Sequence, residues 1–586
     1  MLRIFRHFRV VDFLLVGLCI VLSIVQVWLD LRIPDYMSQI THIINANGVG
    51  LNTSSVWGIC LEMIACAIGS LGVSIGVGLI AAFVGAGFSK RMRTLLYDKI
   101  DSFGMVEMDK FSTSSLVTRS TNDVTQVRML ITMGLQMLIK APMMSVWAII
   151  NISGKRIEWS IATIVAVGIL FTMLAIILML VIPKFSKMQI LTDNINRITR
   201  ENLIGLPVIR AYNSEEYQQH RFEEANKKLV KTQVFTSQAA SVMMPTMSLV
   251  MNGLTLSIFW IGAYLINNTS ILSLQQDIFS NSMVFSSYSV IIVQAFMQIA
   301  TVFIFLPRAS VSAKRINEVM AVTPSIVSGD KEIGYEEKKG TIQFQNVSFA
   351  YPNSGGKVLN DVSFEITQGS TVAFIGSTGS GKTTIVNLMN RFYDTSDGQI
   401  LVDGIDIKLY KLQALYNKIG LVPQKAVMFD GTVATNIAFG KDEYEIEKVD
   451  TALQISQGKD FVYNMQGQLD AEIARGGSNV SGGQKQRLSI ARAVFKQPEI
   501  LIFDDSFSAL DYKTDRAVRA AIKNQINDIT RVIVAQRIGT IRDADKIIVL
   551  DQGRVVGIGT HTQLMKSCEV YQEIAHTQLS EEELCA

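Results

Sequence analysis

A glycine-rich stretch in the second half of the chain has the residue types needed to bind phosphate groups. It reads Gly376, Ser377, Thr378, Gly379, Ser380, Gly381, Lys382, Thr383 and fits the pattern GxxxxGK[ST]. An apolar strand expected over 371–375 precedes it, and a helix expected to open at Thr384 follows it. In this context backbone N–H groups surround the phosphates, Lys382 neutralises the β- and γ-oxygens, and Thr383 offers a hydroxyl to Mg²⁺. We therefore expect a nucleotide site that includes Thr384.

An acidic residue stands where such a site needs a metal ligand. A second apolar strand, expected over 500–503, ends in Asp504. In a protein with a phosphate-binding loop, a carboxylate at this place holds Mg²⁺, often through water. A turn or a helix cap is the alternative for an isolated strand-end aspartate. The presence of the loop favours the metal role.

The first half of the chain is too apolar for an ordinary soluble domain. Charged residues make up 18% of the chain and apolar residues 49%, whereas soluble proteins average about 25% charged residues. Six apolar runs are long enough to cross about 30 Å of hydrocarbon. They lie near 11–33, 56–87, 130–153, 160–184, 245–267 and 279–307. We expect six transmembrane helices in a lipid bilayer, which excludes a soluble ATPase.

Basic residues predict how these helices are oriented. Arg3, Arg6 and Arg9 place the N-terminus in the cytoplasm, and six crossings return the chain there. The inside connections, roughly 88–129 and 185–244, are long, polar and helical in pattern, so the membrane helices should continue into the cytoplasm. The net charge of +3 says little about partners, but no stretch resembles a basic nucleic-acid-binding stripe, so we expect no nucleic-acid partner.

The ionisable residues in or near the apolar runs include Asp30, Glu62 and Lys140. Facing lipid would be costly, so each should face a cavity, a partner or the membrane interface. Asp30 lies near a span end, where a side chain directed to the membrane surface is the favoured explanation. Glu62 and Lys140 remain open between packing and substrate contact.

The composition changes after about residue 322. Residues 323–338 are polar and rich in turn-forming residues, as expected of a linker. The stretch that follows alternates like a strand. The expected domains are a membrane domain over 1–322, the linker, and a nucleotide-binding domain over 339–586.

A short segment between the two nucleotide motifs carries a family resemblance. Ser481, Gly482, Gly483 and Gln484, followed by KQRLSIARA, resemble the signature sequence of ATP-binding cassette (ABC) proteins. The resemblance covers essentially the whole chain, because six spans followed by one cassette is the layout of a half-transporter of the ABC multidrug exporters. It implies an all-α six-helix transmembrane domain followed by an α/β P-loop NTPase domain, with ATP and Mg²⁺ as cofactors. A serine and two glycines at a helix N-terminus suit an anion, here implied to be the γ-phosphate of ATP on the opposite subunit.

The resemblance also implies roles for other single residues. Tyr351 lies where an aromatic ring stacks on adenine, and Gln424 matches the loop that contacts Mg²⁺ and senses the membrane domain. The loop from Ser508 to Asp511 resembles the one that links the two ATP sites across a dimer. The inside connections resemble coupling helices, with candidates near 114–123 and 207–214.

Three positions depart from the family pattern. The family's glutamate, the general base that follows the metal aspartate, is replaced by Asp505. Aspartate is shorter by one methylene, which can take the carboxylate out of hydrogen-bond reach of the attacking water. The family's switch histidine is Gln536, which can hydrogen-bond a phosphate but carries no positive charge. Arg475 stands where a glutamate is frequent, and we have no physical account of its consequence.

With every binding motif intact and both catalytic positions changed, the chain resembles the degenerate half of a heterodimeric exporter. The implied partner is a second half-transporter with glutamate and histidine at these positions. The implied function is outward transport of amphipathic drugs or lipids across a cell membrane, which we expect to be a bacterial inner membrane. Two alternatives stay open: a homodimeric exporter with slow symmetric sites, and an ATP-gated regulator or channel-like protein.

Overall fold

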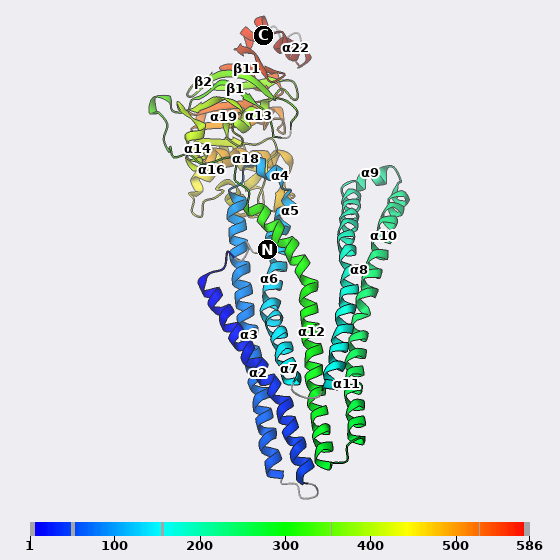
Figure 1. Cartoon of the computed structure of the whole chain (residues 1–586). Coiled ribbons are helices and arrows are strands. Elements are labelled where there is room, and N and C mark those ends of the chain that lie inside the picture. The colour runs from blue at the N-terminus through cyan, green and yellow to red at the C-terminus, as the bar shows by residue number, and fades with distance from the viewer. Residues whose placement is uncertain (1–5, 48–52, 154–156, 353, 527, 579–586) are drawn as a thin grey trace. The chain divides into compact units, whose positions relative to one another are not determined.

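The computed structural model of the protein describes residues 6–47, 53–153, 157–352, 354–526 and 528–578. Arg3 and residues 579–586, which belong to the expectations above, lie outside these ranges. The chain divides into two compact units (Figure 1). One comprises Met1–Asp101 with Ser114–Ala321, and the other Ser102–Thr113 with Val322–Ala586. We call them the membrane unit and the cassette unit.

The membrane unit is entirely helical in its described part. Six of its stretches are long and apolar enough to cross a bilayer, which confirms the six predicted spans: Val10–Ile44, Val56–Asp101, Thr113–Ile152, Ile157–Ile204, Glu215–Asn267 and Leu272–Met320. The helices are α2 (Val10–Asn47), α3 (Thr53–Asp101), α5 (Thr113–Thr118), η1 (Arg119–Asp123), α6 (Val124–Met133), η2 (Gly134–Leu138), α7 (Lys140–Ser153), α8 (Ile157–Ile204), α9 (Leu206–Ala211), α10 (Glu215–Ser241), α11 (Met243–Asn267) and α12 (Leu272–Met320).

Several of these helices are longer than a membrane is thick. Helix α3 has 49 residues, α8 has 48 and α12 has 49, so each spans roughly 70 Å at about 1.5 Å per residue. The hydrocarbon layer needs only about 30 Å. Helices α8 and α10 lie side by side and are joined through α9 (Figure 1). The prediction that the membrane helices continue beyond the bilayer is confirmed.

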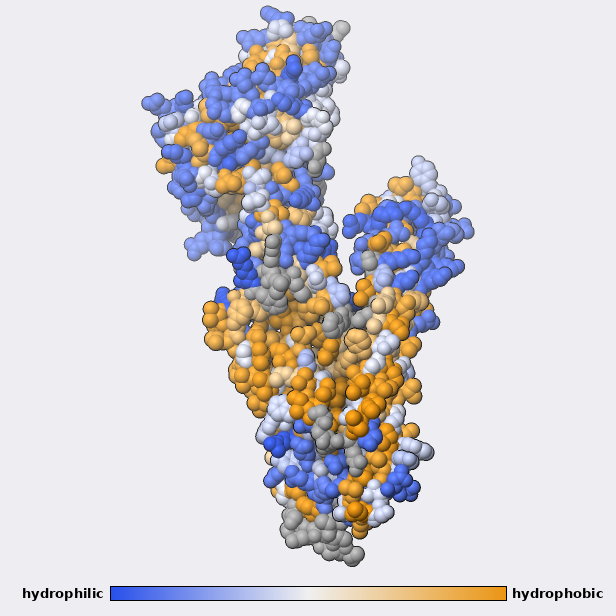
Figure 2. Space-filling view, viewed as in Figure 1, coloured by the Kyte–Doolittle hydropathy of each residue, from blue (hydrophilic) through white to orange (hydrophobic). Residues whose placement is uncertain are grey.

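The surface of the membrane unit is apolar enough to contact lipid acyl chains. Large apolar side chains on α3 are mostly exposed, including Leu61 (66%) and Ile68 (64%). Figure 2 shows hydrophobic residues gathered in a broad area over these helices. Such an area on a soluble protein would promote association, whereas in a bilayer it contacts acyl chains. Inside the unit, Trp159, Phe285 and Tyr288 are fully buried in a common core.

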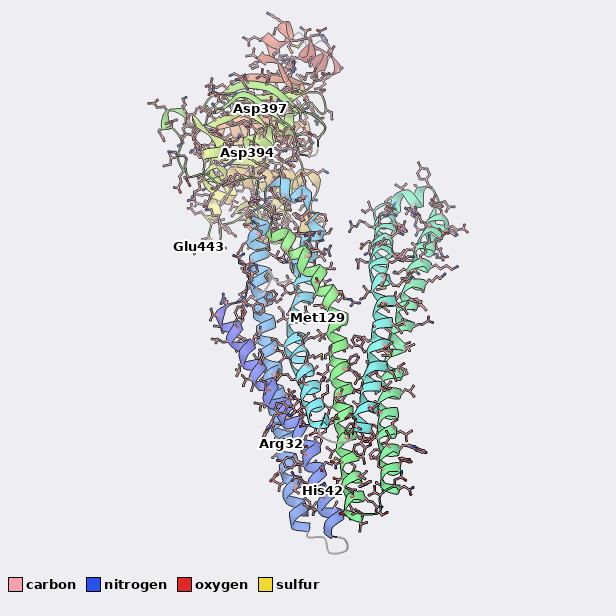
Figure 3. All side chains as sticks on the ribbon, viewed as in Figure 1. Arg32, His42, Met129, Asp394, Asp397 and Glu443 are labelled. Carbon is pink, nitrogen blue, oxygen red and sulfur yellow. The ribbon has the colours of Figure 1, made fainter. Side chains whose placement is uncertain are left out.

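Ion pairing explains two of the charged residues in the spans. Lys140 Nζ lies 3.0 Å from Asp30 Oδ2, and the Ser70 hydroxyl donates to the same carboxylate. Both side chains are largely buried, with 18% and 23% exposure. The expectation that Asp30 is directed to the membrane surface is therefore wrong, because an intramolecular pair compensates its charge. Arg32 lies over the ring of Trp28 at 5.1 Å, and Figure 3 marks it on α2.

The cassette unit is built on three sheets. One is antiparallel with the order β2-β1-β4-β5, the second has the order β12-β11-β3-β10-β9-β6, and a short third pairs β7 with β8. The strands are β1 (Ile342–Phe349), β2 (Leu359–Ile366), β3 (Thr371–Gly376), β4 (Asp397–Val402), β5 (Ile405–Asp406), β6 (Ile419–Val422), β7 (Gly431–Thr432), β8 (Glu472–Ile473), β9 (Ile500–Asp504), β10 (Thr530–Val534), β11 (Lys546–Asp551) and β12 (Arg554–Gly559).

Helices surround these sheets. They are α4 (Met105–Lys110), α13 (Lys382–Met389), α14 (Leu412–Lys418), α15 (Val433–Ile437), α16 (Ile446–Ile455), α17 (Lys459–Tyr463), α18 (Gly482–Phe495), α19 (Tyr512–Gln525), α20 (Ile538–Ile541), α21 (His561–Ser567) and α22 (Glu569–Gln578), with short helical turns η3 (Glu336–Lys338), η4 (Ile407–Leu409), η5 (Gln468–Asp470) and η6 (Arg475–Gly477).

The strand order of the second sheet decides where the functional side chains meet. Strands β3, β10 and β9 are adjacent and parallel, so their carboxyl ends lie along one edge of the sheet. Their apolar side chains, such as Phe374, Ile502 and Val532, are fully buried. As a result the phosphate-binding loop after β3, the aspartates after β9 and Gln536 after β10 leave the sheet at neighbouring positions.

A short segment from the first half of the chain belongs to the cassette unit. Helix α4 is held by Glu107, whose carboxylate accepts from Ser325 N at 2.9 Å and from Gly104 N at 2.9 Å. Tyr393 Oη donates to Asp109 Oδ2 at 3.3 Å, and Val106 packs on the apolar core of the cassette. Of the candidate coupling segments, 114–123 lies instead in the membrane unit, and 207–214 contains α9 and its end.

Candidate nucleotide-binding site

The phosphate-binding loop has a backbone shape that requires glycine. Gly379 and Gly381 have φ values of 85° and 101°, in the left-handed region where glycine has no steric penalty. A Cβ on Gly381 would also lie 2.6 Å from Leu359 Cδ2. Helix α13 begins at Lys382, two residues before the expected start at Thr384. Lys382 and Thr383 therefore lie in the first helical turn, where N–H groups have no intrahelical partner.

Lys382 folds back over its own loop. Its Nζ donates to Gly376 O at 2.8 Å, to Ser377 O at 2.7 Å and to Ser380 Oγ at 3.3 Å. Burial lowers the pKa of Lys382, while Asp505 and Asp504 act in the opposite direction. The ammonium group is thus held by neutral carbonyl and hydroxyl oxygens, which phosphate oxygens could replace with full negative charge.

Thr383 and Asp504 are brought together as the sequence predicts. Thr383 Oγ1 lies 3.4 Å from Asp504 Oδ1, and Asp504 is 7% exposed. Burial raises the pKa of Asp504, and Asp505 raises it further, while Thr383 and Lys382 lower it. A hydroxyl and a carboxylate beside a phosphate site are oxygen donors of the kind that Mg²⁺ uses when phosphates complete its shell. These residues fit the ion.

The three residues Gln424, Asp505 and Gln536 form one hydrogen-bonded cluster. Gln536 Nε2 donates to Asp505 Oδ2 at 2.9 Å, and Gln424 Nε2 donates to the same oxygen at 3.1 Å. Asp505 N donates to Val534 O at 2.9 Å, which ties β9 to β10 at this point. Sequence reasoning selected all three residues separately and missed that they bond to one another. The sequence carried no signal for these bonds, because the three residues lie far apart along the chain.

Asp505 is a constrained carboxylate. It is 8% exposed and its φ is 47°, a value uncommon for a residue other than glycine. Burial raises its pKa, while the amides of Gln424 and Gln536 and the charge of Lys382 lower it. The described neighbours therefore hold the side chain in one position.

Tyr351 lies beside the helix that follows the loop. Its hydroxyl is 3.1 Å from Thr384 Oγ1, and its ring packs edge-on against Phe349 and Tyr393 at 4.9 and 5.1 Å between centroids. The ring is half-buried. This position is close to the phosphate loop, as adenine stacking requires, and the stacking role stays a prediction.

The signature segment is an exposed helix start. Ser481 Oγ accepts from Gln484 N at 3.3 Å, and Gln484 Oε1 accepts from Ser481 N at 2.8 Å, which forms a capping box at the start of α18. Ser481 and Gly482 are exposed and Gly483 is partly so. In the described part of the chain, no hydrogen bond joins this segment to Lys382, Thr383 or Asp504. The structure thus leaves the signature at the surface of its own cassette.

The loop from Ser508 to Asp511 is hydrogen-bonded to Asp505. Ser508 Oγ donates to Asp505 O at 2.8 Å, and Asp511 Oδ1 accepts from Thr514 N at 3.0 Å, capping α19. The hydrogen bond from Thr514 lowers the pKa of Asp511. Arg475 is exposed on η6, and nothing in the described residues explains its identity.

Comparisons with known proteins agree with this arrangement. Residues 16–305 match the family described as ABC transporter transmembrane region, and residues 359–508 match the family described as ABC transporter. An uncharacterized ABC transporter ATP-binding protein of Mycobacterium tuberculosis (strain CDC 1551 / Oshkosh) is 35% identical over 96% of this chain and 96% of its own. The chain belongs to the ABC transporter family. More specifically, it is an exporter-type half-transporter of an ATP-hydrolysing transporter family, a multi-pass membrane protein with a cytoplasmic ATP-binding cassette.

Two further comparisons show similarity between this ABC half-transporter and known exporters. A multidrug resistance ABC transporter ATP-binding and permease protein of Lactococcus lactis subsp. lactis (strain IL1403) is 29% identical over 97% of this chain and 93% of its own. The structure of a bacterial Atm1-family ABC exporter with ATP bound has a TM-score of 0.82, covering 97% of this chain and 98% of that one at 22% identity. The latter shows the exporter fold, six apolar helices followed by an α/β cassette.

Proposed function

We propose that this ABC half-transporter is one subunit of a heterodimeric exporter and that its own ATP site binds ATP but hydrolyses it slowly. The observation that carries the proposal is the cluster at Asp505, where one carboxylate oxygen accepts both Gln536 and Gln424. A general base must reach the proton it removes at about 2.6–3.2 Å. Asp505 is a methylene shorter than the glutamate of the family, and Oδ2 is already engaged by two donors.

The raised pKa of Asp505 is not sufficient to make it an effective general base. Burial raises that pKa, which by itself would make the carboxylate a stronger base. A base must also be positioned, however, and the two amide hydrogen bonds hold Asp505 toward Gln536 and Gln424. The position of the Asp505 carboxylate therefore limits the rate of ATP hydrolysis more than its proton affinity does.

Gln536 removes a second contribution to catalysis. A histidine at this place can donate a hydrogen bond and carry positive charge, whereas an amide remains neutral at every pH. Preorganised charge near the transferring phosphoryl group is a large part of phosphoryl-transfer catalysis. The Gln536 amide already donates to Asp505 at 2.9 Å, so its donor capacity toward a phosphate is reduced.

ATP binding needs none of the altered groups. The loop from Gly376 to Thr383 supplies backbone N–H groups and the Lys382 ammonium, and Tyr351 supplies a ring. Thr383 and Asp504 would hold Mg²⁺ together with the side-chain carbonyl of Gln424, whose amide nitrogen donates to Asp505. When bound, the ion neutralises negative charge on the phosphates.

The intact signature supports a role in a second site. Ser481 to Gln484 form a well-capped, exposed helix start, and a helix N-terminus favours an anion. We infer that it completes the ATP site of a partner half-transporter that carries glutamate and histidine. Hydrolysis there would reset the exporter after ATP binding has closed the cassettes.

The proposed substrates are amphipathic drugs or lipids moving outward. The similarity to a multidrug resistance transporter supports this class. An apolar hollow of about 720 Å³ in the membrane unit also supports it, since only Thr172 among its lining residues has a polar side chain. Its other lining residues are Val165, Gly168, Ile169, Met173, Ile176, Ile177, Leu180, Ala239 and Val242.

Purification of the chain alone and with its partner tests the proposal. The partner would be a second half-transporter with glutamate and histidine at the two positions, and genes beside this one are the first place to look for it. We expect the chain alone to bind ATP but to hydrolyse it about 10²-fold or more slowly than the pair, since a positioned general base typically contributes 10²–10⁴-fold. Robust ATP-driven transport by the chain alone would contradict the proposal and support a homodimer.

A further inference from the structure

The cassette contains a second hollow, away from the phosphate-binding loop. Its volume is about 340 Å³. Its walls come from α19, from β9 and the loop after it, from β10, from the first residue of β3, and from α20 and the residues after it. Phe503, Phe507, Ile522 and Ile533 form an apolar part of the lining. A hollow of this size lies at the lower end of the range for small organic ligands.

Basic side chains dominate the polar part of the lining. Arg516, Arg519, Lys523 and Arg531 all line the hollow, whereas Asp543 is the single acidic residue among the lining residues. Arg519 is neutralised by a two-point ion pair with Asp515, at 2.8 and 3.3 Å. Among the described residues, the other three basic side chains form no ion pair within 4.0 Å. The hollow therefore carries an excess of positive charge.

Arg531 is half-buried, whereas Arg516 and Lys523 are exposed. The Arg531 guanidinium donates to Ile526 O at 2.8 Å and to Thr371 Oγ1 at 3.5 Å, both neutral oxygens, and its Nε is buried without a hydrogen-bond partner in the described structure. Burial lowers the pKa of Arg531, and the charge of Asp545 acts against that. A partly buried cation whose hydrogen bonds go only to neutral oxygens is poorly compensated, so an anionic ligand in the hollow would stabilise it.

We propose that this hollow is a binding site for a small anion with an apolar body. The apolar lining would receive an aromatic or branched group, and Arg516, Lys523 and Arg531 would receive the charge. Nothing in the proposed transport function requires this site, so the two proposals stand or fall separately.

The place of the hollow links it to the loop between the ATP sites. Phe507 directly precedes Ser508, and α19 follows Asp511, so a ligand in the hollow touches both flanks of that loop. Ser508 in turn bonds to the backbone of Asp505. Coupling between two binding events is reciprocal, so ATP should change the affinity of the hollow for its anion.

Photolabelling of the full-length protein with 4-azidobenzoate tests the site. We expect labelled peptides from α19 and β10, with labelling reduced about five-fold or more by excess benzoate, because the carboxylate makes charge-assisted hydrogen bonds. The neutral analogue benzamide and inorganic phosphate should compete far less, since one lacks charge and the other lacks an apolar body. Labelling that is uncompeted, or competed equally by benzamide or phosphate, would overturn the site.

Matched variants sharpen the test. Arg516→Gln and Lys523→Gln change exposed side chains, so the fold should be kept, and each should weaken labelling several-fold. Lys513→Gln lies on the exposed part of the same helix but not in the hollow and should leave labelling unchanged. Equal labelling in all three variants would refute the anion site.

Labelling should also change about two-fold or more when ATP is added. Identical labelling with and without ATP would refute the coupling between the hollow and the ATP site.

Discussion

Gln536 Nε2 lies 2.9 Å from Asp505 Oδ2, so the two residues that replace the catalytic pair of the family are hydrogen-bonded to each other. Residues in direct contact couple energetically, and their substitutions do not add. Restoring one of the family residues without the other would leave an unmatched partner. The two positions should therefore be treated as one unit.

We predict that Asp505→Glu together with Gln536→His raises ATP hydrolysis at this site about tenfold or more, within the range that a positioned base contributes. Asp505→Glu alone should gain less, because Gln536 and Gln424 would still engage the carboxylate. The measurement is ATPase activity of the purified pair in which the partner's glutamate is replaced by glutamine.

Lys382→Ala in the same background is the control, and it should abolish the gained activity because the loop ammonium is lost. If the double substitution leaves hydrolysis unchanged, Asp505 and Gln536 are not the residues that limit the rate of ATP hydrolysis at this site. Equal gains from the single and the double substitution would contradict the coupling between them.

The docked helix α4 provides a second prediction. Glu107 is 5% exposed and accepts from Ser325 N at 2.9 Å. We expect Glu107→Ala to lower transport several-fold while ATP binding by the pair is retained, because α4 is a segment of the first half that belongs to the cassette unit. Transport in vesicles and binding of a fluorescent ATP analogue are the measurements. Tyr393→Phe, which removes only the 3.3 Å bond to Asp109, should have a smaller effect, and a transport rate unaffected by Glu107→Ala would contradict the role of α4.

A buried charge cluster should dominate the stability of the cassette. Lys418 Nζ lies 2.8 Å from both Asp403 and Glu499, and Asp403 is 1% exposed. Lys418→Met should cost about 3–5 kcal/mol, the usual range when one partner of a buried pair is removed. Thermal unfolding of the purified protein measures this. Lys411→Met breaks the exposed pair with Glu332 and is the matched control, with little change expected; an equal loss in both variants would contradict the assignment.

The same cluster predicts a pH dependence. Burial lowers the pKa of Lys418, but the hydrogen bonds and charges of Asp403 and Glu499 outweigh it and raise that pKa above its usual value. A raised lysine pKa gives stability that is complete below the unfolded pKa, about 10.4, and is lost as the pH rises through the folded value. The lysine contribution should therefore be constant from neutral pH to about 9. A Lys418-dependent loss of stability between pH 6 and about 9 would contradict this.

The ion pair inside the membrane unit gives a further prediction. Lys140→Met would leave Asp30, 3.0 Å away, without its cation, and we expect a loss of about 3–5 kcal/mol. Asp30→Asn combined with Lys140→Met should recover most of that loss, because no uncompensated charge remains. Melting temperatures in detergent measure both. A double variant as unstable as the single one would show that packing, and not charge, is what the pair contributes.

The sequence by itself determined the parts of this protein that depend on neighbouring residues. The six spans follow from apolar runs longer than a bilayer is thick, and the phosphate loop follows from closely spaced glycines between a strand and a helix. Asp504 was predictable because a strand of apolar residues ends there. These features are local, so a linear pattern is sufficient to predict them.

Only the tertiary structure decided which distant residues meet. Gln424, Asp505 and Gln536 come from separate strand ends and converge on one oxygen because β6, β9 and β10 are neighbours in one parallel sheet. The candidate coupling segment 114–123 lies in the membrane unit, whereas α4 packs in the cassette unit through Glu107. This packing and the pairing of Asp30 with Lys140 likewise join elements far apart in sequence. Strand order and helix packing arise from the burial of many side chains together, and no single motif contains that information.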